Sequence, residues 1–423
     1  IPMDNHKFSR LHITMIYNSD IVIIGSGLNG LTLSLVLGTT GLKVALVDGD
    51  TLATDYLSTQ KFDGKAYALT IASQRLLKAV NIWPALKKNA QPILDIKVTD
   101  GHPGAGPSPF IMHFNHNEIG DDPIAYMVED RHLRKEFNDR INVSNNIKRF
   151  NGNVINNKLE NNKNQVFLEN GDIIDTKVIL ACDGRGSPTA KRAGILFRNK
   201  NYQQQALVTA LEHEKNHNSV AHQFFMPLGP LAILPLRKNN SSIVWVLSKE
   251  VGEQTSKLNN NAFLEKLRPA FGNFLGDIKV SGKRFSYPLN LITADNFTGE
   301  RLALIGDAAH SIHPLAGQGF NQGIRDIATI AEVLVDAYRR GEDIGTKNVL
   351  NRYSAWRRFD SKSLSSSTDF FNTLFSNDNS YLRLGRNLGM GLINNTSLLK
   401  QFLIREATGL TGDQPRLLQG ITL

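Results

Sequence analysis

The hydrophobic positions near the start of the chain follow a strand–helix–strand pattern. Asp20–Ile24 and Lys43–Val47 contain apolar runs of strand length, and the residues between them show a helical stretch that ends at about Thr39. Continuous apolar runs of this length are typical of buried strands. The pattern therefore predicts a βαβ unit with two buried parallel strands.

A glycine-rich turn and a terminal acid lie at the two ends of this unit. Gly25, Gly27 and Gly30 follow the first strand as GxGxxG, and Asp48 ends the second strand, 23 residues after Gly25. The first glycine allows a tight turn, the second lets a pyrophosphate approach, and the third allows close packing of helix on strand. The acid would accept hydrogen bonds from a ribose. This arrangement predicts dinucleotide binding, and the motif alone suits NAD and FAD equally.

A second site of the same kind lies late in the chain. The apolar run Leu302–Ile305 stops at Gly306-Asp307, and a helical pattern begins at about Asn321. The loop between them contains Pro314, Gly317 and Gly319. Glycines let a backbone approach a flat ligand, and a helix N-terminus offers unpaired N–H donors to negative charge. A second glycine-rich site suits FAD, whose two ends lie far apart, better than NAD.

Composition limits the other possibilities. The chain has 423 residues with 41% hydrophobic content, which is enough for more than one core. Cys182 is the only cysteine, so no disulfide can form within the chain, and its predicted buried strand indicates packing. The histidines lack metal-ligand spacing. The net charge of +9 comes without a nucleic-acid motif, so nucleic acid is not an expected partner.

The segment His313–Asp326 reads HPLAGQGFNQGIRD and fits the pattern HPxAGQGxNxGxxD without a gap. In this segment the chain resembles the flavoprotein aromatic hydroxylases of the p-hydroxybenzoate hydroxylase fold (class A flavoprotein monooxygenases). Among these it is most similar to the FAD-dependent hydroxylases of ubiquinone biosynthesis. Gly229–Leu236, Val244-Trp245 and Tyr287–Leu289 also match. The resemblance runs from about Ser19 to the C-terminus.

The resemblance implies an α/β fold: a Rossmann-like FAD-binding domain, an inserted β-sheet substrate domain and a C-terminal helical segment. We expect an N-terminal extension at 1–18, the FAD-binding domain at 19–96, 120–196 and 282–345, the substrate domain at 97–119 and 197–281, and C-terminal helices at 346–423. Strand-like runs in the insert are Gln204–Leu211, Pro230–Leu236 and Ser242–Leu247. Pro235 and Pro288 should lie at strand ends, because proline cannot donate within a ladder.

The resemblance also assigns residues to the cofactor. The expected FAD-binding residues are Gly25, Gly27, Gly30, Asp48, Lys65, Arg131, Asp183, Gly184, Gly306, Asp307, Gly319, Phe320 and Asn321. Lys65 replaces the arginine usual in the family, and Ala190 stands where another arginine is expected. The Asp183-Gly184 pair has an alternative interpretation as an ordinary turn that closes a strand. Arg131 at a helix start would otherwise be a solvated surface residue.

The chemistry implied by the resemblance needs no indispensable side-chain nucleophile. NADH or NADPH would reduce FAD, and a C4a-hydroperoxide formed with O₂ would transfer one oxygen to a phenol ring. Pro314, Gly317, Gln318 and Gly319 would position the flavin. Phe225, Trp245 and Tyr287 are candidate walls of the substrate pocket, and each could equally belong to the core.

Two other functions remain open at this stage. One is another flavin oxidoreductase of the same fold, such as an epoxidase or a prenyl-lipid reductase. The other is a non-catalytic FAD-binding scaffold in a quinone-biosynthesis complex. We expect a cytoplasmic enzyme with peripheral contact at the inner face of the membrane, since no run approaches the length of a spanning helix. The C-terminal region alternates leucines with arginines and lysines, which suits an anionic bilayer or a simple helical cap.

Overall fold

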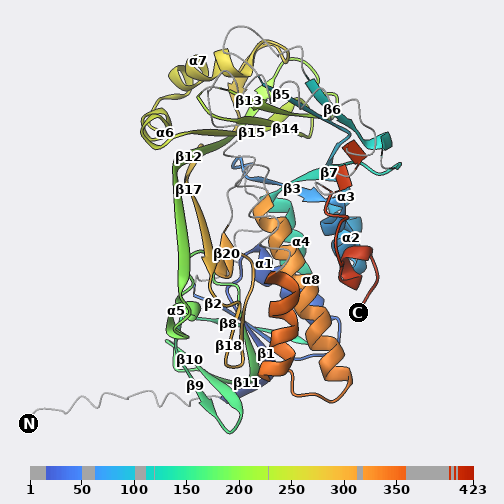
Figure 1. Cartoon of the computed structure of the whole chain (residues 1–423), viewed down its shortest axis with the longest axis vertical. Helices are drawn as coiled ribbons and strands as arrows, with labels where there is room; N and C mark the ends of the chain where they lie inside the picture. The colour runs from blue at the N-terminus through green and yellow to red at the C-terminus, as the bar shows by residue number, and fades with distance from the viewer. Residues whose placement is uncertain are drawn as a thin grey trace, which may run out of the picture.

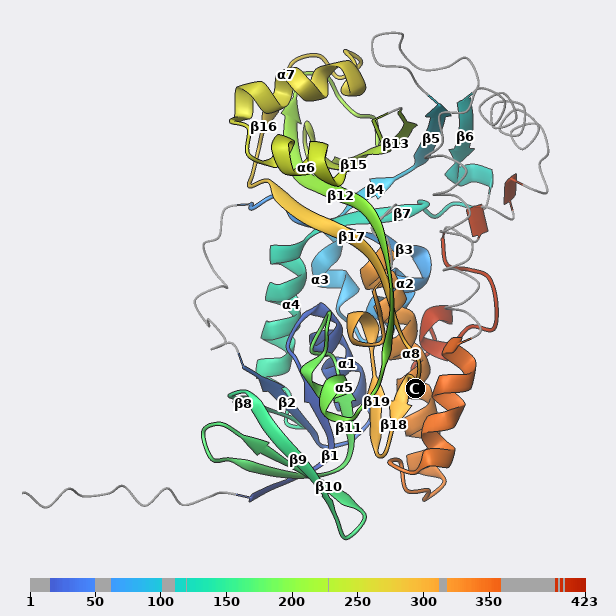
Figure 2. The same cartoon turned by 60° about the vertical axis from the view of Figure 1, so that its left-hand side comes forward.

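The computed structural model describes residues 16–49, 62–100, 111–118, 120–226, 228–311, 318–358, 400–401, 404–405 and 408–423. Figure 1 shows two sheets at opposite ends of an elongated molecule, with helices packed beside the lower one. The predicted extension before residue 16 lies outside the described residues. The two long strands β12 and β17 run between the two ends in both views (Figures 1 and 2).

The lower sheet is a parallel dinucleotide-type sheet. Its strands run in the order β18-β19-β11-β1-β2-β8, and β10 and β9 extend it from β11 as an antiparallel hairpin. The bounds are β1 Ile16–Ile24, β2 Val44–Asp48, β8 Ile147–Asn151, β9 Val154–Glu160, β10 Lys163–Leu168, β11 Ile173–Ala181, β18 Thr298–Gly299 and β19 Leu302–Leu304. The predicted strands of the βαβ unit, together with α1 (Leu28–Gly38), are therefore confirmed.

Helices cover this sheet and form one large core with it. The bounds are α2 Ile71–Ala79, α3 Trp83–Lys87, α4 Asp130–Asn142, α5 Pro188–Arg192 and α8 Gln318–Arg339. A further helix is formed by residues 347–358. Ile21, Leu33 and Ile327 are fully buried in this core. The apolar runs of the sequence thus formed strands buried on both faces, as parallel sheets require.

The upper sheet has nine strands and belongs largely to the insert. Its order is β20-β17-β12-β15-β14-β13-β5-β6, and β16 pairs with β12. The bounds are β5 Asp95–Asp100, β6 Ile111–Asn115, β12 Phe197–His213, β13 Val220–Phe225, β14 Leu231–Leu236, β15 Asn240–Ser248, β16 Ile278–Val280, β17 Phe285–Ala294 and β20 His310–Ser311. Helices α6 (Lys249–Ser256) and α7 (Asn260–Phe271) lie on its upper side (Figure 1).

Two predictions about this sheet need correction. Residues 285–294, assigned to the FAD-binding domain, form β17 and pair with β12 in the upper sheet. Pro288 is not at a strand end but inside β17, opposite Gln205. The sheet tolerates a proline at this position because β20 pairs with β17 only at Ile292 and Thr293. At Pro288 the strand is therefore an edge, where a missing N–H costs little.

A small sheet and three short 3₁₀ turns complete the described structure. The small sheet has the order β3-β7-β4, with β3 Ala66–Thr70, β7 Ala125–Glu129 and β4 Gln91–Ile93, and lies between the two large sheets (Figure 1). The 3₁₀ turns are η2 His116–Glu118, η3 Gly306–Ala308 and η4 Arg416–Gln419. The last of these packs against α2 and α8.

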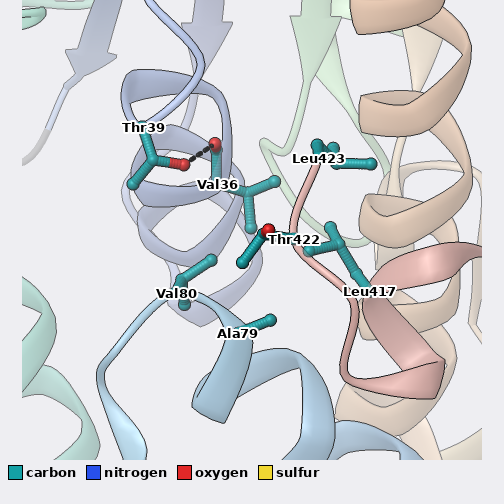
Figure 3. A pocket seen from close by; sticks show the side chains of 7 residues that line it. All are labelled: Val36, Thr39, Ala79, Val80, Leu417, Thr422 and Leu423. Carbon is teal, nitrogen blue, oxygen red and sulfur yellow. Dashed lines mark hydrogen bonds between the residues drawn. The ribbon is translucent and has the colours of Figure 1, made fainter.

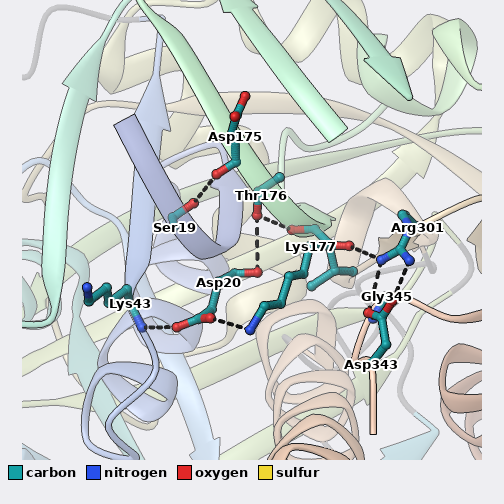
Figure 4. A network of polar contacts seen from close by, with 10 residues as sticks. Ser19, Asp20, Lys43, Asp175, Thr176, Lys177, Arg301, Asp343 and Gly345 are labelled. Carbon is teal, nitrogen blue, oxygen red and sulfur yellow. Dashed lines mark hydrogen bonds and ion pairs between the residues drawn. The ribbon is translucent and has the colours of Figure 1, made fainter. Parts of the chain in front are cut away.

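The ends of the parallel strands differ in character. A polar network ties the strands together away from the glycine turn: Asp20 binds the Lys177 ammonium at 2.8 Å, and Arg301 pairs with Asp343 (Figure 4). The chain end packs against α1 and α2, where Leu417, Thr422 and Leu423 border a small pocket with Val36 and Val80 (Figure 3). Neither feature borders the glycine turn after β1, where the cleft described below opens.

Candidate active site

The first glycine turn has the backbone that the sequence predicts. Gly25 has φ +103°, and a Cβ there would lie 2.5 Å from the carbonyl oxygen of Cys182. A Cβ on Gly30 would lie 1.9 Å from the carbonyl oxygen of Gly25. A Cβ on Gly27 would meet nothing within 4 Å. Two glycines are thus required by packing inside the protein, whereas Gly27 borders open space at the start of α1.

This open space is a cleft of about 600 Å³ at the carboxyl ends of the parallel strands. The predicted residues that line it are Gly25, Gly27, Asp48, Asp183 and Gly184. Asp48 accepts a hydrogen bond from the Ser26 hydroxyl. In open parallel sheets, ligands bind in crevices outside the carboxyl ends of the strands. The cleft therefore has the position, the backbone and the terminal acid of a nucleotide site.

Asn153 and Arg192 also line the cleft, and no motif singled them out. Asn153 follows β8, which is parallel to β2, so its place at the same edge follows from the strand order. It lies so close to Gly49 that a Cβ on Gly49 would be 1.8 Å from its Oδ1. Asn153 could have been predicted as a cleft residue if β8 had been recognised in the sequence as the next parallel strand. Arg192 brings a positive charge to the cleft.

The side chain of Asp183 shapes its own loop. Its Oδ1 accepts a hydrogen bond from the Ser187 hydroxyl at 2.5 Å, and its Oδ2 accepts one from the Thr189 N–H at 3.0 Å. Gly184 follows with φ +77° and has open space around it. The carboxylate therefore stabilises the turn before α5, which is the structural role that the sequence left open, while the backbone of Gly184 borders the cleft.

The second predicted loop begins with a glycine in the left-handed backbone conformation, which disfavours other residues. Gly306 has φ +62°, and a Cβ there would lie 2.1 Å from Nδ2 of Asn29 on α1. Gly323 on α8 approaches the same side chain, since its Cβ would lie 2.2 Å from Oδ1 of Asn29. Asn29, from the first motif, is thus held between two glycines of the second one. The two distant motifs form one structural unit.

Asp307, next in the loop, is a half-buried acid. Burial raises the pKa of its carboxyl above the ordinary value, and the positive charges of Arg185 and His310 act in the opposite direction. A buried carboxylate without a strong partner is destabilising unless a ligand supplies hydrogen-bond donors. This environment suits a group that binds hydroxyls, as predicted for Asp307.

A buried ionic network fixes the second loop. Asp326 on α8 is 0% exposed and accepts hydrogen bonds from Gly306 N–H at 2.8 Å, His310 Nε2 at 2.8 Å and Arg357 Nε at 2.7 Å. Burial alone would raise the pKa of Asp326, but the facing His310 and Arg357 hold it below its ordinary value. The network joins the loop, α8 and the helix at 347–358. His310 and Arg357 were not predicted as site residues.

The start of α8 is anchored through Asn321. Its side-chain amide donates to the carbonyl of Ala68 at 2.7 Å, and its Oδ1 accepts from Thr70 N–H and the Ser73 hydroxyl. The side chain is therefore occupied by β3 and α2, and it positions the helix. A Cβ on Gly319 would meet nothing within 4 Å. Pro314 and Gly317 lie outside the described residues, and of Gln318 only the backbone is described.

Lys65 and Arg131 lie apart from the cleft. The Lys65 ammonium is 4.5 Å from the centre of the Phe285 ring, and the Arg131 guanidinium is 5.8 Å from that of Phe62. Arg131 Nε also donates to Glu129 at 2.6 Å. Neither lines the nucleotide cleft, and Lys65 contacts the upper sheet through Phe285 on β17.

The comparisons with known proteins agree with this geometry. The model of the FAD-binding domain family matches residues 18–365. The chain belongs to this family. Its cofactor is therefore FAD. The ubiquinone hydroxylase UbiL of Rhodospirillum rubrum is 37% identical over 411 residues, covering 96% of this chain and 94% of that protein.

Other relatives extend this picture. The 3-demethoxyubiquinol 3-hydroxylase of Escherichia coli K12 is 29% identical over 394 residues, covering 93% of this chain and 99% of that protein. Among solved structures, p-nitrophenol 4-monooxygenase PnpA of Pseudomonas putida DLL-E4 superposes with a TM-score of 0.77 at 17% identity, covering 95% of this chain and all of that one. At that identity the likeness concerns the fold.

The described residues fit FAD. The open space beside Gly27 admits a pyrophosphate to the N-terminus of α1, where unpaired N–H groups favour negative charge. Asp48 offers an acceptor at the end of β2. At the other end of the site, Gly319 in the first turn of α8 leaves space for a flat ligand. FAD has two distant ends, and the site has open space beside Gly27 and beside Gly319. Asn29 on α1 packs against Gly306 and Gly323 and so fixes the two loops relative to each other.

The face of the upper sheet toward the FAD-binding domain is the candidate substrate face. Ala206 on β12 pairs with Tyr287 on β17, and directly opposed residues share a face. Tyr287 is 40% exposed on that face. Phe225 lies four residues after Ala221 on β13 and so shares its face, and Ala221 packs in a cluster with Ile93 and Met127. Phe225 and Tyr287 therefore lie on the same face of the upper sheet and stay candidates for the substrate pocket.

Trp245 lies on the other face, and of the two interpretations that the sequence left open, pocket wall and core, the structure agrees with the core. It pairs with Leu207, is 0% exposed, and its ring lies 6.3 Å from that of Phe263 on α7. It belongs to the core between the upper sheet and α7. Burial of a large aromatic side chain stabilises this layer.

Proposed function

We propose that this protein hydroxylates the aromatic ring of a polyprenylated phenol in ubiquinone biosynthesis, with NADH or NADPH as electron donor. The observation that carries the proposal is the match with the ubiquinone hydroxylase UbiL, 37% identical over 96% of this chain, together with the open space beside Gly27 in the glycine turn. When bound, FAD accepts a hydride from NAD(P)H and, once reduced, activates O₂ to insert one oxygen into an aromatic ring.

The residues of the chain supply position and electrostatics. Gly25 and Gly27 bring backbone close to the pyrophosphate, and Asp48 holds a ribose. The half-buried Asp307 accepts hydrogen bonds from ribityl hydroxyls. The N-terminus of α8 presents N–H donors and a partial positive charge to a negative ring, which stabilises it by about 0.3–2 kcal/mol. The sheet above excludes water from the reacting atoms.

We also propose contact with the membrane surface and with other enzymes of the pathway. A polyprenyl tail partitions into a bilayer, so the enzyme must reach its substrate there. In the part of the chain that the structure describes, no helix is both long and apolar enough to cross a membrane. The leucine- and arginine-rich segment expected to touch the lipid, such as Leu382 and Arg386, lies outside the described residues. Co-sedimentation with anionic vesicles tests this contact.

The function is tested with purified FAD-loaded protein. We expect a prenylated phenol to stimulate NAD(P)H oxidation and to gain one oxygen atom, which carries the label when ¹⁸O₂ is supplied. Flavin that binds but is not reduced by either nucleotide would favour the scaffold function. Reduction without oxygen transfer, accompanied by loss of a double bond in the tail, would favour a prenyl-lipid reductase, and oxygen on the tail would favour an epoxidase.

A further inference from the structure

Asn29 lies at the junction between the two glycine-rich motifs. It is the second residue of α1, which lies beside α8 in both views (Figures 1 and 2). Its neighbours in the turn are Gly27, which borders open space, and Gly30, which packs against the carbonyl of Gly25. The dinucleotide-binding motif fixes the glycines and leaves position 29 free. The side chain of Asn29 is therefore not a requirement of the turn itself.

The two loops beside Asn29 leave room for an amide of this size. A Cβ on Gly306 would lie 2.1 Å from Nδ2, and a Cβ on Gly323 would lie 2.2 Å from Oδ1. Neither position admits a larger residue while the amide stays where it is. The amide nitrogen thus faces Gly306, the residue before Asp307, and the amide oxygen faces Gly323 on α8.

The amide of Asn29 has no partner within the part of the chain that the structure describes. Its Oδ1 is buried and receives no hydrogen bond there. Its Nδ2 has no acceptor among the same residues. An unpaired buried polar atom is destabilising, and an apolar side chain could fill this space without that cost. The polarity of Asn29 is therefore explained by a ligand and not by packing.

The N-terminus of α1 provides the place for this ligand. No side chain caps the helix at Gly27, and its first turn contains no acidic residue. Uncapped N–H groups at the start of a helix attract phosphate. In FAD, the cofactor of this family, one phosphate carries the ribityl chain, for which Asp307 is the expected partner. That phosphate is expected on the Gly306 side of Asn29, where Nδ2 lies.

We propose that Nδ2 of Asn29 donates a hydrogen bond to the flavin-side phosphate of FAD. A hydrogen bond to a charged acceptor is stronger than one between neutral groups, so it offsets the cost of the unpaired amide. Because Asn29 also packs against Gly306 and Gly323, it links the phosphate to the loop of Asp307 and to α8. It is a positioning residue for the cofactor. The inference rests on FAD binding and is independent of the substrate that the enzyme hydroxylates.

A simple spacer between α1 and the loop at Gly306 would behave differently. A spacer stabilises the FAD-free protein by packing, so its removal lowers the Tm before FAD is added. Removal of an amide without a partner should instead leave the Tm of the FAD-free protein unchanged and weaken FAD binding. The stability of the FAD-free protein therefore separates the two roles.

The test compares Asn29→Ala and Asn29→Asp with the wild type, both loaded with FAD and after removal of FAD by acid and salt. We expect Asn29→Ala to raise the dissociation constant for FAD by about 10- to 150-fold, the effect of one hydrogen bond to a charged group. Asn29→Asp keeps the shape but places a negative charge beside the phosphate. Its effect should be larger and should shrink as salt is added.

Phosphorus NMR identifies the group that Asn29 contacts. Bound FAD gives one ³¹P resonance for each of its two phosphates. With Asn29→Ala at saturating FAD, we expect the resonance of the flavin-side phosphate to shift and that of the adenosine-side phosphate to stay in place.

Asn146→Ala is the matched control. Asn146 lies at the other end of α1, where its Nδ2 donates to the carbonyl of Gly38 at 2.9 Å. Its amide thus has a partner in the protein, and its removal should lower the Tm of the FAD-free protein. The dissociation constant for FAD and both ³¹P resonances should remain as in the wild type.

Three results would overturn the inference. The first is an unchanged dissociation constant in Asn29→Ala. The second is a lower Tm of FAD-free Asn29→Ala with both ³¹P resonances in place, which is the behaviour of a spacer. The third is an equal shift of both resonances, which indicates a general disturbance of the turn. A wild type that shows the expected NMR difference from Asn29→Ala but does not hydroxylate a prenylated phenol overturns the proposed function alone and supports the inference.

Discussion

The two ends of the FAD site are built in different ways. The cleft after β1 is made by backbone: a Cβ on Gly25 or Gly30 would lie only 2.5 Å or 1.9 Å from a backbone carbonyl oxygen, so a larger residue does not fit at either position. The loop at Gly306 is held by a buried ionic network centred on Asp326. The first device is close packing of backbone between the turn and the end of β11, whereas the second joins charged side chains from three elements. The comparison teaches that two glycine-rich motifs of similar appearance can be fixed by backbone packing or by a buried network of charged side chains.

The largest expected effect comes from breaking the network. Arg357→Ala leaves the carboxylate of Asp326 buried with one partner fewer, and breaking a buried pair in this way costs about 3–5 kcal/mol. We expect a loss of this size in the free energy of unfolding by urea, accompanied by loss of bound FAD. Arg352→Ala, which removes an exposed partner of Glu342, is the control and should change neither quantity. A stable, FAD-loaded Arg357→Ala protein would show that the loop does not depend on the network.

The glycine turn gives the next effect. Gly25→Ala places a side chain in a left-handed backbone conformation and against the Cys182 carbonyl, so we expect destabilisation of at least about 1–3 kcal/mol. Gly27→Ala should leave the Tm unchanged, because nothing lies within 4 Å of the added Cβ. It should nevertheless raise the dissociation constant for FAD, measured by flavin fluorescence. Equal effects of the two substitutions on the Tm would contradict the difference between a packing glycine and a binding glycine.

The smallest expected effect concerns how the stability of the protein depends on pH. Two acids near the second loop, Asp326 and Asp307, contribute to this dependence with opposite signs. Asp326 has a lowered pKa when folded, so its contribution to stability is present above its ordinary pKa and is lost as pH falls through the folded value. Asp307 has a raised pKa, so it destabilises the FAD-free protein at neutral pH, and this cost disappears as pH falls through the raised value. Asp307→Asn should therefore raise the Tm of FAD-free protein at pH 7 and weaken FAD binding. A lower Tm would contradict the assignment.

The local motifs of the chain could be interpreted from the sequence alone. The turn at Gly25, the acid at Asp48 and the start of a helix near Asn321 each depend on neighbouring residues, and the structure contains each of these elements. What binds to them follows from the family to which the chain belongs. For the part of the chain that the structure describes, the sequence thus predicted the two parallel strands, the glycine turn and the long helix with bounds close to those observed.

The rest depended on contacts between distant residues. His310 and Arg357 meet Asp326 across 16 and 31 residues, and no spacing rule indicates such a meeting. For Trp245 the sequence left pocket wall and core open, because alternation along β15 shows that two faces exist but not which one is covered by α7. Pro288 was expected at a strand end because the sequence does not reveal that β17 is an edge at that point. Local propensity sets the elements, and tertiary packing decides the faces.

The most direct test of the central claim is the flavin content of the purified protein. The account predicts one FAD per chain, released on denaturation and identified by its absorption and by its full dinucleotide mass. It also predicts that FAD removed by acid and salt rebinds with recovery of the original spectrum. A protein that is colourless when isolated, and stays so after incubation with FAD, would contradict the claim that the two loops hold one cofactor between them.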